Sequence, residues 1–127
     1  MAHAHARIGE PRYSTSIDVS GFRLKADEPT AQGGGDSGPA PYDLLVASLS
    51  ACTAITLRMY AERKEWPLTA LEVDVRLIKA DSGDSIERTL AIAGLDQGQR
   101  NRLTEVAERT PVTLTLKAGI PIRTSLK

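Results

Sequence analysis

The sequence is poor in the residue types that build metal sites and disulfides. Its 127 residues include one cysteine, Cys52, and two histidines, His3 and His5. The histidines have the spacing of a chelating pair, but no further Cys, His or Asp stands near them to complete a site. We therefore predict no bound metal and no other cofactor. Because a lone cysteine forms no disulfide within its chain, we expect a reducing compartment and a cytoplasmic protein.

Aromatic residues are few, and neither sign of charge is in excess. The chain has one Trp, one Phe and three Tyr, and its sixteen basic side chains balance sixteen acidic ones. Nucleic-acid-binding proteins normally carry a basic patch and often stack bases on aromatic rings, so we predict no nucleic-acid partner. The first seven residues, MAHAHAR, lack the apolar core of a signal peptide, and no membrane association is expected.

The longest uncharged run lies between Asp43 and Arg58 and contains fourteen residues. It is too long for a strand, and its Ala and Leu content favours a helix. A membrane span needs about 18 apolar residues, and this run is shorter and contains several hydroxyl side chains. Pro41 suits the first helical position. We predict a helix from Pro41 to about Lys64 that is buried on most sides, with a second helix, which could come from another subunit, packed on its small residues.

Alternating apolar and polar residues predict strands before and after this helix. Residues 13–19 and 22–26 flank a Ser20-Gly21 turn and predict a first hairpin. Residues 71–77 and 86–92 predict a second hairpin with one solvated face.

The last third of the chain begins with a capping box from Asp96 to Gln99, which predicts an amphipathic helix that ends at Thr110-Pro111. Residues 112–116 and 120–126 then predict a third hairpin. The sequence therefore predicts a single α+β domain over residues 1–127, in the order β-β-α-β-β-α-β-β, with residues 1–11 flexible.

Three glycines, Gly33, Gly35 and Gly38, match the letters of a dinucleotide-binding loop, G-x-G-x-x-G. Such a loop follows an apolar strand and opens a helix with free N–H groups. Here the preceding residues are polar, and Pro39 and Pro41 remove donors where a pyrophosphate would bind. We predict an ordinary loop.

Cys52 is the remaining candidate for chemistry. A free cysteine in an apolar helix is usually a small buried hydrophobic residue. A reactive thiolate there needs a positive group from elsewhere, because the helix dipole fades after the first turn and Arg58 points away around the helix. Arg12 of the first strand, or an arginine of a partner subunit, is the expected source.

Several motifs resemble the OsmC/Ohr family, in particular its small OsmC-like proteins. They are Asp27-Glu-Pro, Gly33-Gly, Gly38-Pro-Ala-Pro-Tyr-Asp-Leu-Leu and Leu49-Ser-Ala-Cys-Thr-Ala-Ile-Thr-Leu-Arg-Met-Tyr-Ala. The resemblance implies the OsmC-like fold, in an intertwined homodimer with the long helices at its centre and the active sites at the subunit interface. It also implies thiol-dependent reduction of organic hydroperoxides or peroxide, as part of oxidative or osmotic stress defence.

The sequence departs from the family pattern at the second cysteine. Where the family has a Cys-Pro-Val-His-like motif, this chain has Thr110-Pro-Val-Thr113, so the resolving thiol is replaced by Thr110. An oxidised Cys52 would then have to be reduced directly by an external thiol or dithiol, as in a one-cysteine cycle.

A second departure concerns the arginine that activates the thiol. A glutamate that helps Ohr enzymes hold this arginine corresponds to Tyr42, with Asp43 beside it, and these two are the candidate binding residues. The arginine itself corresponds to Arg12 or to Ser14. The resemblance thus implies Cys52 and Arg12 as the catalytic residues.

Three hypotheses follow for the function. The first is a single-cysteine hydroperoxide reductase. The second is a catalytically silent family member that binds a small ligand between its subunits, with Cys52 serving only for packing. The third is a thiol redox sensor, which needs a reactive Cys52 but little turnover.

Overall fold

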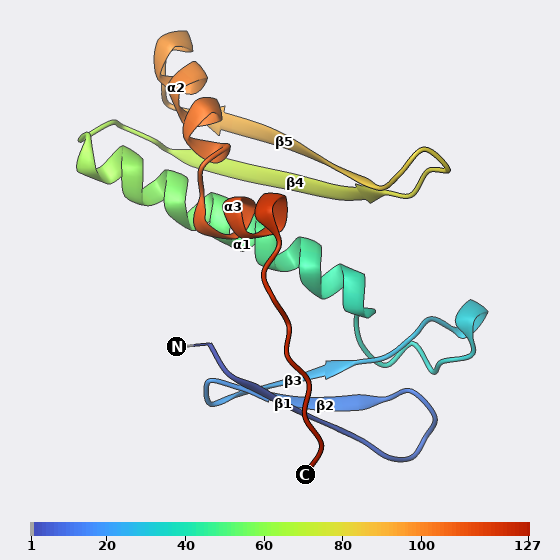
Figure 1. The fold of residues 1–127 in the computed structure, drawn as a ribbon. Coiled ribbons are helices and arrows are strands. Elements are labelled where there is room, and N and C mark those ends of the chain that lie inside the picture. Colours follow the sequence, from blue (N-terminus) through green and yellow to red (C-terminus); the bar gives the residue numbers. More distant parts are fainter. Residues whose placement is uncertain (1) are drawn as a thin grey trace. The chain divides into compact units, whose positions relative to one another are not determined.

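The computed structural model describes residues 2–127, which form two compact units (Figure 1). The first unit extends to Leu45 and the second from Val46 to Lys127. The α+β class and the long helix of the prediction are confirmed. The boundary between the units falls inside that helix, and each unit is described by itself.

The first unit contains a three-stranded antiparallel sheet in the order β1-β2-β3. Strands β2 (Thr15–Val19) and β3 (Phe22–Ala26) form the predicted hairpin. Both turn residues, Ser20 and Gly21, have positive φ angles of 50° and 87°, as a two-residue turn between twisted strands requires.

Strand β1 (Ala4–Ile8) lies in a segment for which the sequence predicts no strand, and the flexibility of residues 1–11 stays a prediction. It pairs antiparallel with β2, with Ala4 opposite Val19 and Ile8 opposite Thr15. Ala4, Ala6 and Ile8 alternate with His5 and Arg7, but Ile8 is the one large apolar residue of the strand and all five side chains are exposed, so the strand signal in the sequence is weak. Backbone hydrogen bonds to β2 hold it in place.

The glycine-containing loop that follows β3 is folded around the carboxylate of Asp27. Asp27 is 4% exposed, and its oxygens accept hydrogen bonds from the backbone N–H groups of Glu28, Gly35 and Ser37 and from the Ser37 hydroxyl, at 2.6–3.3 Å. The Ser37 hydroxyl is the main cause of a lowered pKa for Asp27. The N–H groups of this loop thus bond the carboxylate of Asp27, whereas a dinucleotide-binding loop directs its N–H groups to a phosphate. This geometry is that of an ordinary loop, as the sequence predicts.

Helix α1 (Pro41–Arg63) begins and ends where the sequence predicts. Pro41 is its first residue, and the Asp43 carboxylate accepts the N–H of Ala40 at 3.0 Å, which caps the helix start. After Arg63 the chain turns at Glu65, whose φ is 57°.

The second unit combines most of α1 with a hairpin and two short helices. Strands β4 (Ala70–Ile78) and β5 (Ser85–Ala93) pair antiparallel, as predicted. Helix α2 (Gln97–Ala107) begins at the predicted capping box, in which Asp96 and Gln99 bond each other's backbone N–H groups. Figure 1 shows β4 and β5 extended in the direction of α1, with α2 and α3 (Pro111–Ala118) beside them.

Helix α3 shows that the predicted third hairpin is wrong. Residues 111–118 are helical, and residues 119–127 contain no strand. Pro111, which the prediction treated only as a helix terminator, instead occupies the first position of a new helix, where its missing N–H costs nothing. The alternation of Val112 to Leu116 was misleading because burial of Thr113 and its polar contacts override the strand pattern.

The core of the second unit lies between α1, α2 and the hairpin. Leu57 and Leu103 are fully buried at its centre. Along α1 the buried residues recur every four positions and are Leu49, Thr53, Leu57 and Ala61. A single chain therefore buries one stripe of the helix, while Ile55 and Met59 on other faces stay about half exposed.

Among residues 2–127, α1 is the one helix that is long and apolar enough to cross a membrane by length and composition alone. Its middle, however, carries Thr53, whose hydroxyl accepts a hydrogen bond from the guanidinium of Arg88. A cation at the centre of a bilayer is costly. This contact therefore fits a helix packed within a folded protein.

Candidate functional site

Cys52 lies on α1 with its side chain partly buried. Its Sγ accepts a hydrogen bond from the backbone N–H of Val112, with an N–S distance of 3.5 Å, and lies 4.0 Å from Oγ1 of Thr56. Both neighbours are polar, so this sulfur is not sealed in hydrocarbon.

The N–H group that faces the sulfur belongs to the first turn of α3. Pro111 at the first position has no N–H, so Val112 carries the first N–H of the helix. The first N–H groups of a helix lack partners within it and carry a partial positive charge. The Val112 N–H therefore directs a partial positive charge at the sulfur of Cys52. The positive group thus comes from a second helix, and sequence reasoning, which sought a side-chain cation, missed it.

Arg12, the predicted activating residue, belongs to the first unit. Its guanidinium lies 5.2 Å from the ring centre of Tyr13, and Nη2 lies 3.5 Å from the Tyr13 hydroxyl. Cys52 belongs to the second unit, and the placement of the two units relative to one another is not determined. Pairing of Arg12 with Cys52 stays a prediction.

Tyr42 and Asp43, the predicted binding residues, lie in the first turn of α1. Asp43 caps the helix by accepting the N–H of Ala40, and Tyr42 is 57% exposed. Capping of the helix accounts for the position of the Asp43 carboxylate without any ligand. A binding role for these two residues stays a prediction.

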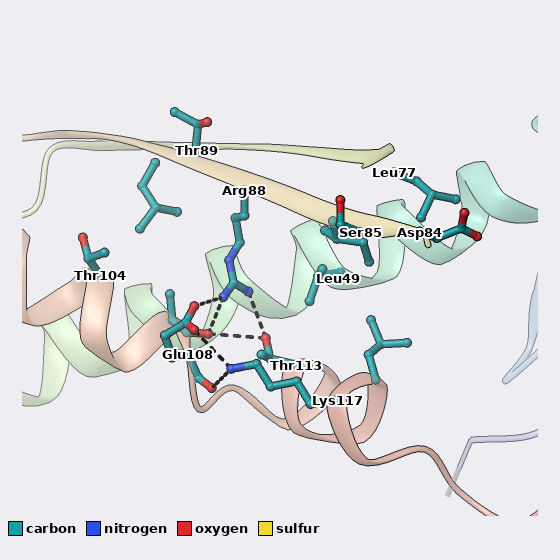
Figure 2. Close-up of a pocket in the computed structure, with 14 residues that line it drawn as sticks. Leu49, Leu77, Asp84, Ser85, Arg88, Thr89, Thr104, Glu108, Thr113 and Lys117 are labelled. Atoms are coloured by element: carbon teal, nitrogen blue, oxygen red, sulfur yellow. Dashed lines mark hydrogen bonds and ion pairs between the residues drawn. The ribbon is translucent and has the colours of Figure 1, made fainter. Parts of the chain in front are cut away.

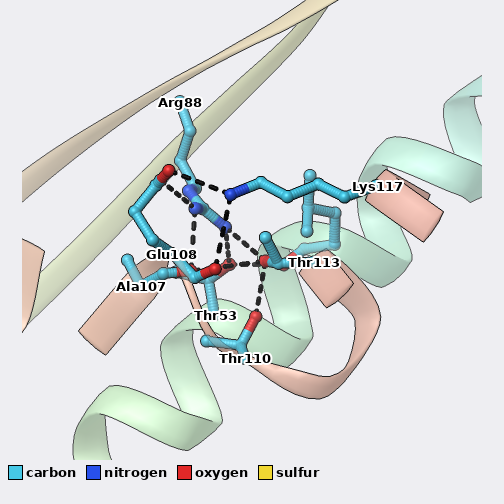
Figure 3. A network of polar contacts seen from close by, with 8 residues as sticks. Thr53, Arg88, Ala107, Glu108, Thr110, Thr113 and Lys117 are labelled. Carbon is cyan, nitrogen blue, oxygen red and sulfur yellow. Dashed lines mark hydrogen bonds and ion pairs between the residues drawn. The ribbon is translucent and has the colours of Figure 1, made fainter. Parts of the chain in front are cut away.

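The functional residue that sequence reasoning missed is Arg88 on β5, whose side chain is only 11% exposed. Nη1 donates to the hydroxyls of Thr53 at 3.0 Å and Thr113 at 2.9 Å. Nη2 donates to the carbonyl of Ala107 at 2.8 Å and to the carboxylate of Glu108 at 3.0 Å (Figure 3). The sequence does contain a sign of this burial. Arg88 has the same strand parity as Ile86, Leu90 and Ile92, so it lies on the inward face of β5 with these apolar residues.

Further contacts extend these bonds into what we call the Arg88 network. Its members are Thr53, Arg88, Ala107, Glu108, Thr110, Thr113 and Lys117. The Thr110 and Thr113 hydroxyls are 2.6 Å apart, and Nζ of Lys117 lies 3.1 Å from Oε1 of Glu108. Lys117 is the main cause of a lowered pKa for Glu108, and Arg88 adds to it. The network joins α1, β5, the end of α2 and α3.

A pocket of about 780 Å³ opens beside this network (Figure 2). Its polar lining includes Arg88, Glu108 and Lys117. Its apolar lining includes Leu49, Leu77, Ile86, Leu90 and Leu116. Cys52 is not among the residues that line the pocket. Within residues 2–127 no group of three or more His, Cys, Asp or Glu side chains could hold a metal ion.

Comparison with known families decides what this arrangement belongs to. A model of the OsmC-like protein family matches residues 33–125, a span that includes the loop, α1, the β4–β5 hairpin, α2 and α3. The chain belongs to the OsmC-like protein family. No curated protein matches the sequence significantly.

Solved structures of OsmC-like proteins share the fold. An OsmC-like protein from Mycoplasma pneumoniae superposes with a TM-score of 0.75 at 16% identity, covering 94% of this chain and 89% of the other. A Legionella pneumophila structure described as organic hydroperoxide resistance protein OsmC has a TM-score of 0.70 at 22% identity, with 92% and 89% covered. The organic hydroperoxide resistance protein OhrB of Bacillus subtilis has a TM-score of 0.66 at 24% identity, with 94% and 92% covered.

The segment from Thr110 to Thr113 lies close to Cys52. In this chain Thr110 is fully buried, precedes the first residue of α3, and lies two residues before the N–H that faces Cys52. The segment that resembles the family's second-cysteine motif is therefore close to the thiol. Here it offers a backbone N–H and no second sulfur.

Proposed function

We propose that this protein reduces organic hydroperoxides or hydrogen peroxide through Cys52 alone. The Cys52 thiolate attacks the terminal oxygen of the hydroperoxide, and the O–O bond breaks. Its electron pair leaves with the alkoxide, which takes up a proton and departs as the alcohol. The sulfur is oxidised to a sulfenic acid.

The observation that carries this proposal is the contact between Sγ of Cys52 and the N–H of Val112. It gives a partly buried thiol a preformed donor at the positive end of a helix, which favours the thiolate that performs the attack. Family membership and neighbours named as organic hydroperoxide resistance proteins support the same chemistry.

Completion of the cycle needs a reductant from outside the chain, because Cys52 is the only cysteine. A first external thiol condenses with the sulfenic acid, forms a mixed disulfide and releases water. A second thiol attacks that disulfide, frees Cys52 as a thiol and leaves with the first as a disulfide. A dithiol supplies both steps in one molecule. A sulfenic acid that is not reduced would be oxidised further and irreversibly.

The working form in this proposal is a cytoplasmic homodimer that serves in oxidative or osmotic stress defence. The half-exposed Ile55 and Met59 give α1 an apolar face that a second copy could cover. In such a dimer the partner subunit could supply Arg12 to the site. Neither nucleic acid nor membrane is part of the proposal.

A second candidate function is the binding of a small ligand by a catalytically silent protein. The pocket of about 780 Å³ favours it, because this space combines apolar walls with a few charged groups and is not lined by Cys52. In that case the thiol would be a packing residue.

One experiment separates the candidates. Reduced protein is mixed with cumene hydroperoxide or hydrogen peroxide, sulfenic acid at Cys52 is trapped and counted by mass spectrometry, and turnover is measured with a dithiol, with Cys52→Ser as the control. Fast oxidation with turnover is expected. Fast oxidation without turnover would indicate a redox sensor instead, and an inert thiol would leave ligand binding.

A further inference from the structure

Arg88 is buried more thoroughly than its position on a two-stranded hairpin requires. Its side chain is 11% exposed, while its acidic partner Glu108 is 61% exposed and is shared with Lys117. Most of its remaining bonds go to neutral oxygens, on Thr53, Thr113 and Ala107. Burial of a cation against mainly neutral acceptors costs free energy, so a residue in this position calls for an explanation beyond stability.

The geometry of the contacts points to the start of α3. Arg88 bonds the Thr113 hydroxyl, which in turn lies 2.6 Å from the Thr110 hydroxyl. These two threonines bracket Val112, whose N–H faces the sulfur of Cys52. The first turn of α3 is thus fixed at both of its ends by the chain of bonds that begins at Arg88.

The same guanidinium also fixes α1, where the thiol is located. Nη1 donates both to Thr113 on α3 and to Thr53, which follows Cys52 directly in the sequence. One nitrogen therefore sets the spacing between the helix that carries the sulfur and the helix that carries its donor. The hydrogen-bond partners of the Cys52 sulfur among the described residues are Thr56 and Val112, so Arg88 acts on the thiol through other groups.

We propose that Arg88 is a positioning residue for the Cys52 thiol, which holds the N-terminus of α3 against the sulfur and so keeps the thiol in a reactive state. The inference rests on the proposed chemistry of Cys52. A lysine would not replace Arg88, since a single ammonium group lacks the two-pronged geometry that reaches α1, α2 and α3 together.

The charged groups around this site come from several elements. Glu108 follows α2, Lys117 lies on α3 and Arg88 is the contribution of β5, whereas Arg58, six residues after Cys52 on α1, donates to the carbonyl of Leu68. Lys117 and Glu108 pair with each other and are both more than half exposed. Glu108 and Lys117 are thus occupied with each other. The group that Arg88 positions beside the sulfur is the N-terminus of α3.

The test uses the fact that Cys52 is the only cysteine, so alkylation of the intact protein reports on it alone. The rate of reaction with iodoacetamide is measured from pH 5 to 10 for the wild type and for Arg88→Met, with Cys52→Ser as the blank. We expect the rate of Arg88→Met at pH 7 to fall about threefold to tenfold, with the pH midpoint moved upward.

Three further variants keep the result interpretable. Thr113→Val breaks the bond to α3 while leaving Arg88 in place, and it should shift the midpoint in the same direction by a smaller amount. Arg76→Met on the exposed face of β4 is the matched control and should leave the profile unchanged. Arg88→Lys should fail to restore the wild-type profile.

The outcomes separate this inference from the proposed function. A folded Arg88→Met or Thr113→Val protein with the wild-type alkylation profile would overturn the positioning role, whatever the peroxidase result. A wild-type thiol that shows the predicted dependence on Arg88 but does not react with hydroperoxides would uphold the positioning role and overturn the peroxidase proposal.

Discussion

Each of the two units has a charged side chain that is largely buried, Asp27 in the first and Arg88 in the second, and the hydrogen bonds that satisfy the two charges differ. Asp27 in the first unit is bonded by groups from residues 28–37, all within one loop. Arg88 in the second unit is bonded by residues between Thr53 and Thr113, on three helical segments. The local arrangement shapes a loop, whereas the long-range arrangement couples the elements around a thiol. Loss of the arginine should therefore be felt over a larger part of the molecule.

The largest expected effect is that of Arg88→Met on stability. The change leaves the carbonyl of Ala107 without its guanidinium donor and removes the bonds that join β5 to three helices. We expect the free energy of unfolding to fall by about 2–4 kcal/mol, from the desolvation cost of acceptors left unpaired. Urea unfolding followed by circular dichroism measures it, with Arg76→Met as the control. If Arg88→Met lowered the free energy of unfolding no more than Arg76→Met does, the Arg88 network would contribute little to stability.

A change in the loop of the first unit should have the next largest effect. A Cβ at Gly34 would collide with the carbonyl of Glu28 and approach the Asp27 carboxylate, so Gly34→Ala forces the loop to move. We expect a loss of about 1–3 kcal/mol in the same unfolding measurement. Gly9→Ala, where a Cβ would meet nothing within 4 Å, is the control. Equal stabilities of the two variants would show that the loop is loosely held.

The hydrogen bond from Arg88 to Thr113 on α3 should contribute less to the free energy of unfolding than the whole Arg88 network does. Thr113→Val keeps the side-chain volume and removes the hydroxyl that accepts from Arg88 and also bonds the Thr110 hydroxyl and the Ala107 carbonyl, so we expect a loss of about 1–2 kcal/mol. Thr104→Val on α2, whose hydroxyl bonds only the carbonyl of Arg100, is the matched control. Urea unfolding of the pair measures the difference. A Thr113→Val protein as stable as the wild type would indicate that Arg88 finds another acceptor.

The smallest expected effect concerns the dependence of stability on pH through Asp27. The pKa of Asp27 in the folded protein lies below its ordinary value, chiefly through the Ser37 hydroxyl. Its contribution is therefore complete above the pKa of the unfolded chain, at about pH 5 and higher, and is lost as the pH falls through the folded pKa. The urea concentration at the unfolding midpoint should therefore fall between pH 6 and pH 3 in the wild type. Asp27→Asn should reduce this fall, whereas Asp81→Asn, in an exposed turn, should leave it unchanged.

Much of the fold was predictable because its signals are local. Pro41 with Asp43, the Ser20-Gly21 turn and the Asp96–Gln99 capping box each fix an element boundary within a few residues. Two elements were not predictable for opposite reasons. Strand β1 has only alanines and Ile8 as apolar residues and buries none of them, and α3 carries a strand-like alternation that its tertiary contacts override.

The site was predictable only in part. The uncharged helix and its single cysteine identify Cys52 directly from the sequence. The donor that faces it is a backbone N–H at the start of α3, and no residue type marks such a group. Arg88 was visible as a charge on an apolar strand face, but its partners, spread from Thr53 to Thr113, emerge only from the fold.

The rate of sulfenic acid formation at Cys52 tests the account most directly. Native protein and protein unfolded in urea are each mixed at pH 7 with a small excess of cumene hydroperoxide, and trapped sulfenic acid is followed by mass spectrometry. We predict that the native thiol reacts at least about tenfold faster, because the start of α3 favours its thiolate only in the folded protein. A native thiol that reacts no faster than the unfolded one would contradict the account.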